Sequence, residues 1–306
     1  MMQIKFLSTC VAVAGLVLSA NGALIPQLEG YSVYTSGNFT GFNSDIHDGS
    51  LVAGGNVTLT NYRVADGSLI SGGTVDLTRG TYKDIYAKNG IVNSSATING
   101  SQTIGGPSPL DFAAINDQLS NLSDAFSGTT SNITSTSEWG GGAIRLSGIN
   151  DLNVFTIDAS DLKNLGGLFI DVDEDEKVLI NVTNTTGTVA GFRDGFNMVI
   201  NNSYDENVRR SLADRILFNF TEATTELKLN GTFFGTFLAM GADIEGKDGN
   251  LNGGLFAKSY SGSQQFHINS FDVPVTNVPE PATVSMMILG VVCLLGISRK
   301  KFVNKK

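Results

Sequence analysis

Cysteine, histidine and tryptophan are almost missing from this chain of 306 residues, and their scarcity narrows the chemistry that it can perform. The two cysteines, Cys10 and Cys293, both lie in apolar segments near the ends of the sequence. The long middle part therefore has no disulfide, no thiol nucleophile and no cysteine-bound metal. His47 and His267 are the only histidines, and Trp139 is the only tryptophan. These counts exclude a cysteine-dependent enzyme and a zinc finger.

The motifs of several enzyme classes are missing as well. The sequence contains no Gly-x-Ser-x-Gly elbow, no His-Glu-x-x-His motif and no phosphate-binding P-loop. Its 20 basic and 29 acidic residues give a net charge of −9, which makes nucleic acid a poor partner. We therefore expect a protein that is not an enzyme, needs no cofactor and binds no nucleic acid.

The last thirty residues have three successive parts. A polar Val-Pro-Glu-Pro segment comes first, an apolar segment at 282–298 follows, and a basic cluster comes next. The apolar segment is at the short end of the 17 to 25 residues, roughly, that cross a bilayer, and the basic cluster would stay on the cytoplasmic side. An ordinary single-pass anchor is one interpretation. The residues that define the polar and basic parts are Val278, Pro279, Glu280, Pro281, Arg299, Lys300 and Lys301.

In order and spacing, residues 278–301 resemble a PEP-CTERM sorting signal. The resemblance implies that an exosortase-type protease in the inner membrane recognises the segment 276–306 and removes the tail from a membrane-anchored precursor. The N-terminus agrees with export: Lys5 precedes the apolar stretch 6–18, and small residues at 19–23 suit cleavage. We therefore predict a signal peptide at residues 1–23.

The body of the chain contains an internal repeat. Gly49–Thr60 returns as Gly67–Thr78, eighteen residues later and without a gap, and a looser third copy covers Asp84–Val92. The same offset relates Gly235–Ala239 to Gly253–Ala257. Self-similarity at a short fixed period is typical of stacked repeats.

Within each copy, apolar residues such as Val57 and Leu59 alternate with polar ones, as in a half-buried strand. A Gly-Gly pair separates two strand pieces, and we expect it to form a corner with positive φ. One copy cannot bury its own apolar face, so we predict a mainly β fold, a β-solenoid of coils of about 18 residues over 24–275, with Leu51 and Leu69 in adjacent layers. A repeated hairpin in a β-sandwich is the alternative.

One segment, about residues 109–127, has the pattern of a helix. Ser108 can cap it, Pro109 suits its first position, and Gly128 follows as a stop signal. We expect the helix to lie on the side of the solenoid. The apolar stripe that it would bury is Phe112, Ile115, Leu119, Leu122 and Phe126.

Residues 31–273 resemble the choice-of-anchor A family, whose domain is also described as adhesive. The stretches that carry the resemblance are Tyr34–Phe39, Val52–Val57, Gly235–Ile244, Asn252–Ala257 and Gln264–His267. Members carry differing C-terminal anchors, the PEP-CTERM signal among them. The resemblance implies display at the cell surface and little more.

The candidate binding residues are few. Asp171, Asp173 and Asp175 would share one face of a strand and suit calcium, but the EF-hand spacing is missing, and a solvated charged turn is favoured. Trp139, followed by three glycines, could contact a glycan or pack against a cap of the solenoid. His267 is interpreted as a hydrogen-bonded structural histidine, because His47, in a turn, is the only other imidazole.

The leading hypothesis is a non-enzymatic protein, secreted across the inner membrane, that ends at the cell surface or in the biofilm matrix and binds extracellular polysaccharide or another surface ligand. The first alternative is a polysaccharide-active β-helix enzyme using Lys177 and Arg193 with the three aspartates. The second is an ice-binding protein. Ice binding calls for a regular threonine array, yet Asp76 follows Thr58 in the repeat.

Overall fold

The computed structural model describes residues 24–64, 66–173, 175–183, 189–221, 224–268 and 271. The predicted signal peptide and the sorting segment, with its apolar stretch 282–298, lie outside this part. No helix within the described ranges has the length and hydropathy needed to cross a membrane. The described residues are mainly β, with parallel pairing almost throughout and three α-helices among them.

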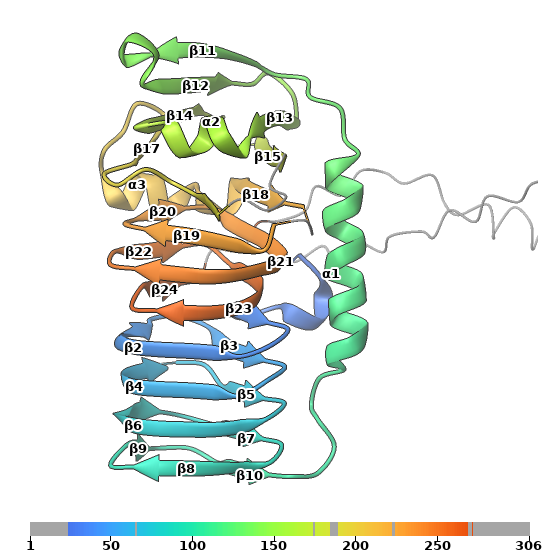
Figure 1. The fold of residues 1–306 in the computed structure, drawn as a ribbon, viewed down its shortest axis with the longest axis vertical. Coiled ribbons are helices and arrows are strands. Elements are labelled where there is room, and N and C mark those ends of the chain that lie inside the picture. The colour runs from blue at the N-terminus through green and yellow to red at the C-terminus, as the bar shows by residue number, and fades with distance from the viewer. Residues whose placement is uncertain are drawn as a thin grey trace, which may run out of the picture. The chain divides into compact units, whose positions relative to one another are not determined.

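The N-terminal half winds as stacked coils of parallel strands (Figure 1). Leu51 pairs with Leu69, and Val57 pairs with Val75, so the eighteen-residue offset of the sequence is the register of neighbouring strands. Hairpins would give antiparallel pairs, so the β-sandwich alternative is wrong. The strands are β1 (Tyr31–Thr35), β2 (Phe39–Ile46), β3 (Ser50–Ala53), β4 (Val57–Val64), β5 (Leu69–Ser71), β6 (Thr74–Tyr82), β7 (Ile85–Ala87), β8 (Gly90–Ser94), β9 (Thr97–Ile98) and β10 (Gln102–Ile104).

The C-terminal half forms coils of the same kind, and its last coil pairs with the first coil of the N-terminal half. We call this junction the seam. There β23 pairs in parallel with both β1 and β2, and β24 pairs with β2 at Phe266 and Ile46. The strands of this half are β13 (Leu152–Asp158), β15 (Lys177–Thr183), β16 (Val189–Gly191), β18 (Ile216–Phe220), β19 (Glu226–Asn230), β20 (Phe233–Phe234), β21 (Thr236–Lys247), β22 (Asn250–Asn252), β23 (Leu255–Gly262) and β24 (Gln265–His267).

A separate four-stranded sheet lies in the C-terminal half. In it β11 and β12 are antiparallel, whereas β12, β14 and β17 run parallel to one another. The elements are β11 (Thr134–Glu138), β12 (Ala143–Ser147), β14 (Gly167–Asp171) and β17 (Asn197–Ile200), with the short helices α2 (Ala159–Asn164) and α3 (Glu206–Ser211) nearby in sequence.

The glycine pairs serve close packing, which differs from their expected role as positive-φ corners. A Cβ at Gly72 would lie 2.2 Å from the carbonyl oxygen of Gly54 in the preceding coil, so only glycine permits this stacking. Positive φ falls elsewhere, for example at Asn43 and Asn61, which occupy equivalent corners of successive coils with φ of 53° and 51°. Asparagine tolerates this conformation better than most residues.

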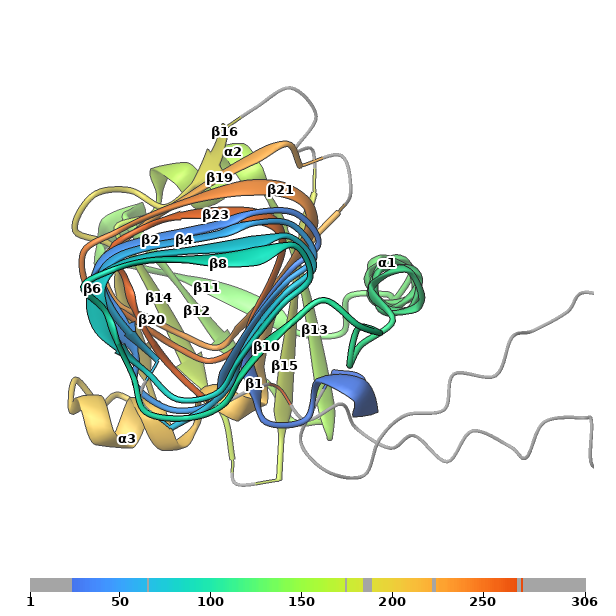
Figure 2. The same cartoon turned by 90° about the horizontal axis from the view of Figure 1, so that it is seen from below.

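The long helix is α1 (Phe112–Ser127), and it lies beside the stacked coils, as the view along the stack shows (Figure 2). Four of the five predicted stripe residues are buried, and Phe112 is half-buried. Its N-cap is Asp111, whose carboxylate accepts a hydrogen bond from the backbone N–H of Ala114. The prediction that Ser108 caps the helix is therefore wrong. Ser108 instead bonds both backbone groups of Leu110, which closes a turn before the helix begins.

Buried asparagines hold α1 against the coils. Asn219 donates to Asn181 at 2.9 Å and to the carbonyl of Ser123 at 3.0 Å, and it accepts from the Ser123 hydroxyl at 2.7 Å. Asn181 in turn donates to the carbonyl of Phe126 at 2.8 Å. The two side-chain amides therefore supply hydrogen-bond partners to polar groups of the helix and of each other, which are buried away from water.

Replacing Asn219 by alanine should lower the free energy of unfolding by about 2 kcal/mol, because it leaves buried donors and acceptors without partners. Denaturant unfolding measures the change. Asn207→Ala is the matched control, since Asn207 is exposed on α3, and its effect should stay within about 0.5 kcal/mol. Equal losses in the two variants would contradict a role for the amide network.

Candidate functional site

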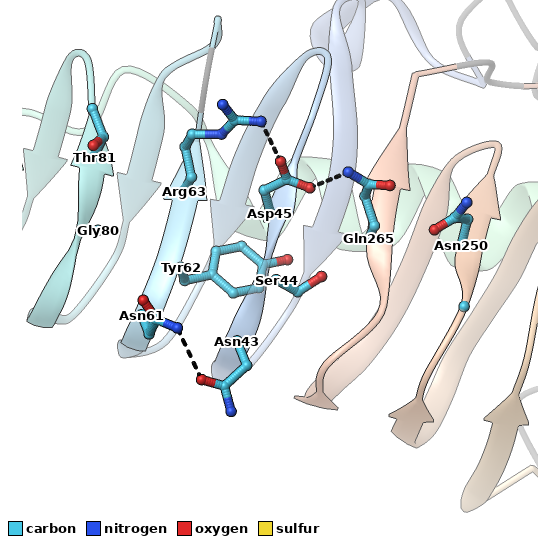
Figure 3. Close-up of a pocket in the computed structure, with 11 residues that line it drawn as sticks. Asn43, Ser44, Asp45, Asn61, Tyr62, Arg63, Gly80, Thr81, Asn250 and Gln265 are labelled. Atoms are coloured by element: carbon cyan, nitrogen blue, oxygen red, sulfur yellow. Dashed lines mark hydrogen bonds and ion pairs between the residues drawn. The ribbon is translucent and has the colours of Figure 1, made fainter.

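A polar groove opens on the face made by the ends of β2, β4 and β6 together with β22 and β24 (Figure 3). Its volume is about 500 Å³. A second hollow of about 580 Å³ shares Asn43 and Gly249 with it and extends toward β21 and β23. We call the two together the seam groove. The side chains that line the first hollow are those of Asn43, Ser44, Asp45, Asn61, Tyr62, Arg63, Thr81, Asn250 and Gln265.

The seam groove is organised around the carboxylate of Asp45, which is 12% exposed. Arg63, in the next coil, contacts one carboxylate oxygen at 2.5 Å, and the amide of Gln265, across the seam, donates to the other at 2.5 Å (Figure 3). Asp45, Arg63 and Thr81 occupy paired positions of successive strands. The polar groups therefore recur once per coil, at the strand spacing of about 4.8 Å.

The rim and floor of the seam groove add aromatic surface. Phe42 lines the second hollow and is 41% exposed, whereas the residue paired with it in the next coil is Thr60. Beneath the polar layer, the ring of Tyr62 is buried, and burial raises the pKa of its hydroxyl well above the usual value. A planar apolar face beside amide, guanidinium and carboxylate groups is the surface that a sugar ring can use.

The predicted calcium residues do not share a strand face. Strand β14 ends at Asp171, whose carboxylate is held by the guanidinium of Arg145 at 2.8 and 2.9 Å. Asp173 and Asp175 are exposed in the turn that follows. The shared strand face is therefore wrong, and only Asp173 and Asp175 lie in an exposed turn. Lys177, a residue of the enzyme alternative, lies with its ammonium 5.7 Å from the ring centroid of Phe271.

Trp139 packs on one side and faces solvent on the other. Its ring meets Phe169 edge to face at 5.1 Å and covers Gly167, where a Cβ would come within 2.6 Å of it. The side chain remains 51% exposed. Trp139 therefore packs on the four-stranded sheet. The contact of its exposed half with a glycan stays a prediction.

The two histidines, 220 residues apart, meet at the seam. Their ring centroids are 5.0 Å apart, and Nδ1 of His267 lies 3.6 Å from a carboxylate oxygen of Asp48. His267 is 4% exposed. Burial, together with the positive charge of Arg210, lowers the pKa of His267, although the nearby Asp48 opposes this effect.

This pairing is what the sequence interpretation missed. The sequence predicts a hydrogen-bonded structural histidine at 267 and no contact with His47, because nothing local relates the two residues. The parallel pairing of Ile46 with Phe266 brings the two histidines together. This pairing is visible only in the folded structure, and no pattern in the sequence indicates it.

The outer face of β2, β4 and β6 carries the threonines considered for ice binding. Thr40 pairs with Thr58, but Thr58 pairs with Asp76, as the repeat predicted, and Asp76 pairs with Val92. The threonine array is therefore interrupted at the third coil.

A family model described as "Putative Ice-binding-like adhesive domain" matches residues 25–268. A second model, a PEP-CTERM protein-sorting motif, matches residues 277–301. No match to a curated protein was found.

Two of the similar solved structures are ice-binding proteins. One, from an Antarctic biological consortium, is 14% identical with a TM-score of 0.39 over 88% of this chain and 95% of its own. The other, from an Arctic yeast, is 12% identical with a TM-score of 0.34 over 83% of this chain and 96% of its own.

Proposed function

The chain belongs to the family described as "Putative Ice-binding-like adhesive domain" and carries a PEP-CTERM motif, and from this premise we propose that it is a non-enzymatic adhesive protein that binds extracellular polysaccharide in the seam groove. The sorting motif supports export and a location at the cell surface or outside it. The observation that carries the proposal is a row of polar groups, one per coil, beside the exposed ring of Phe42.

The architecture in this proposal is a β-solenoid of the choice-of-anchor A kind, in which coils of about eighteen residues present equivalent positions. A polymer laid across the strands would meet Asp45, Arg63 and Thr81 in turn. Guanidinium, carboxylate and amide groups exchange hydrogen bonds with sugar hydroxyls, and an open groove accepts a chain that continues beyond it at both ends.

In this proposal the protein is first exported as a precursor that residues 282–298 anchor in the inner membrane. An exosortase-type protease then removes the tail and releases the domain to the surface or the biofilm matrix. Absence of catalysis is part of the proposal. Its support is that the carboxylate of Asp171, the first residue of the enzyme alternative, is already bound by Arg145.

Ice binding has less support than polysaccharide binding. Charged Asp76 interrupts the threonine column on the face of β4 and β6, and a flat ranked array is what that activity needs.

The double variant Phe42→Ala and Arg63→Ala should weaken binding to exopolysaccharide purified from the host strain by about tenfold or more, because it removes an aromatic face and a charged hydrogen-bond donor. Co-sedimentation over a concentration series measures the affinity. Lys163→Ala removes one exposed positive charge on α2, outside the groove, and is the control for net charge. Equal affinity of the double variant and the wild type would refute the groove as the binding surface.

A further inference from the structure

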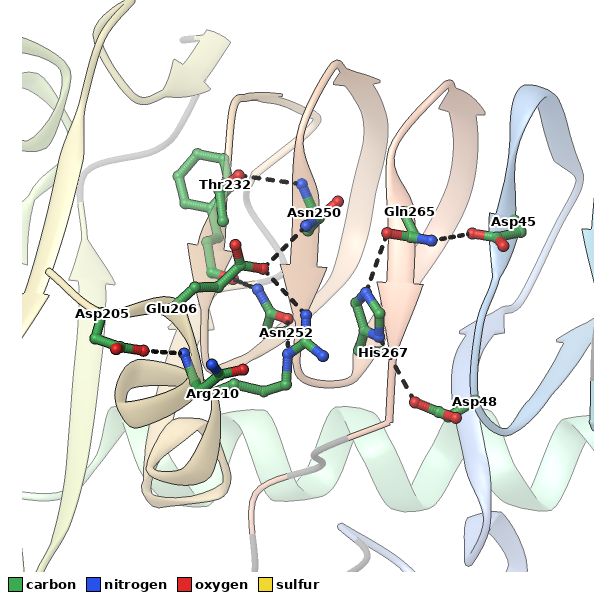
Figure 4. A network of polar contacts seen from close by, with 12 residues as sticks. Asp45, Asp48, Asp205, Glu206, Arg210, Thr232, Asn250, Asn252, Gln265 and His267 are labelled. Carbon is green, nitrogen blue, oxygen red and sulfur yellow. Dashed lines mark hydrogen bonds and ion pairs between the residues drawn. The ribbon is translucent and has the colours of Figure 1, made fainter.

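A cluster of His47, Asp48 and His267 straddles the seam beside the groove. Figure 4 shows two of its members, Asp48 and His267, on neighbouring coils. His47 and Asp48 follow the end of β2, and His267 is the last residue of β24. The backbone amide of His47 donates to the carbonyl of Phe266 at 2.9 Å, which fixes the two segments side by side. One ligand atom from each of the three side chains lies within 4.8 Å of the other two.

The hydrogen-bond chain that leads to His267 fixes which ring nitrogen carries the proton. Asp45 is bound by Arg63, so its other oxygen accepts from the amide nitrogen of Gln265 at 2.5 Å. The amide oxygen of Gln265 must therefore face Nε2 of His267, at 3.1 Å. An amide oxygen only accepts, so Nε2 donates.

With Nε2 directed at Gln265, Nδ1 is the ring nitrogen that faces Asp48. This atom is buried, makes no hydrogen bond and lies 3.6 Å from a carboxylate oxygen of Asp48. A buried polar atom without a partner is costly. A cation bound between Nδ1 and this carboxylate would give both atoms a partner.

We propose that His47, Asp48 and His267 bind a divalent transition-metal ion, with Zn²⁺ as the best fit. Two imidazoles and one carboxylate are ligands for Zn²⁺ and its neighbours in the first transition series, whereas Ca²⁺ and Mg²⁺ prefer oxygen ligands alone. The fourth position is open to water or to an oxygen of a ligand in the adjacent groove.

The surroundings meet the geometric demands of such a site. Zn–N and Zn–O distances of about 2.0–2.2 Å place tetrahedral ligand atoms roughly 3.4 Å apart, closer than the limit of 4.8 Å within which they lie. His47 is exposed and the Asp48 side chain is 45% exposed, so both can turn toward the buried His267. The bond from Nε2 of His267 to Gln265 is the outer-shell contact that orients a metal-bound histidine.

Such a metal would tie the last coil of the chain to the first. Metal ligands from β24 and from the end of β2 would close the seam from outside the core, and the metal would stabilise the folded state by mass action. Zn²⁺ removal with a chelator should then lower the thermal midpoint by on the order of a few degrees.

The test uses the chelator-treated, tag-free protein and ZnCl₂ in isothermal titration calorimetry. We expect one Zn²⁺ per chain, and we expect neither CaCl₂ nor MgCl₂ to compete at tenfold excess. His47→Ala and Asp48→Asn should each weaken Zn²⁺ binding at least tenfold, because the loss of an outer-shell partner alone costs about 10–100-fold. Asp76→Asn, an exposed acid on β6 away from the seam, is the control and should bind as the wild type does.

Cobalt gives a second readout that does not depend on stability. Co²⁺ in a tetrahedral site with nitrogen and oxygen ligands produces visible d–d absorption, and this band should disappear in His47→Ala. Substoichiometric Zn²⁺ binding, unchanged affinity in His47→Ala, or equal binding of Ca²⁺ would overturn the proposal. If no ion binds at all, a proton shared by His267 and Asp48 would account for the cluster. Polysaccharide binding by the double groove variant is measured without metal, so the two proposals can fail separately.

Discussion

Replacing Pro279, Glu280 and Pro281 together by alanine should abolish nearly all release of the protein to the cell surface and medium. The triple substitution leaves the apolar segment 282–298 and the basic cluster intact, so membrane insertion should continue. The sorting protease, however, would lose the polar part of its recognition motif. We expect the larger, unprocessed form to accumulate in the membrane fraction, as cell fractionation and immunoblotting would show.

This variant separates the two interpretations of the C-terminal segment. For an ordinary single-pass anchor, the three residues ahead of the span are irrelevant, and the substitution would leave both size and location unchanged. Deleting 278–306 altogether cannot make this distinction, because either interpretation predicts loss of the membrane form. Lys305→Ala with Lys306→Ala lies beyond the matched residues 277–301 and serves as the control.

Much of the fold within each half could be predicted from the sequence. The register of β3 with β5 and of β4 with β6 follows from apolar residues that recur at one offset, because a one-residue slip would turn every inward side chain outward. The helical stripe was readable for the same reason. The cap was not, since Ser108 and Asp111 are both good N-cap residues and only the turn at Leu110 decides between them.

The seam could not be predicted, and with it the candidate site. Its pairs join β23 and β24 to β1 and β2, segments more than 200 residues apart with no common offset. Neither the Asp45–Gln265 bond nor the meeting of His47 with His267 has a local signal. One feature of the sequence did mark the groove. Phe42 occupies an outward position that holds threonine in the next two coils.

Replacing Phe39 by alanine should lower the free energy of unfolding by about 3–5 kcal/mol, the cost of removing a large aromatic side chain from a core. Phe39 lies on β2 and is fully buried. Its ring stacks on Tyr260 of β23 at 4.8 Å and lies 6.2 Å from Phe266 of β24, so it joins the first coil to the last one. A loss of this size is a large share of the usual stability of 5–15 kcal/mol for a domain.

The same strand offers the control. Phe42→Ala removes the same ring three residues further on, but from an exposed position, and should change the free energy of unfolding by no more than about 0.5 kcal/mol. Denaturant unfolding followed by tyrosine fluorescence and by far-UV circular dichroism would compare the two. If the seam joins the halves into one cooperative unit, both probes should shift together in Phe39→Ala. A transition that splits, with one half unfolding first, would show that each stack is stable alone and that the seam merely brings them together.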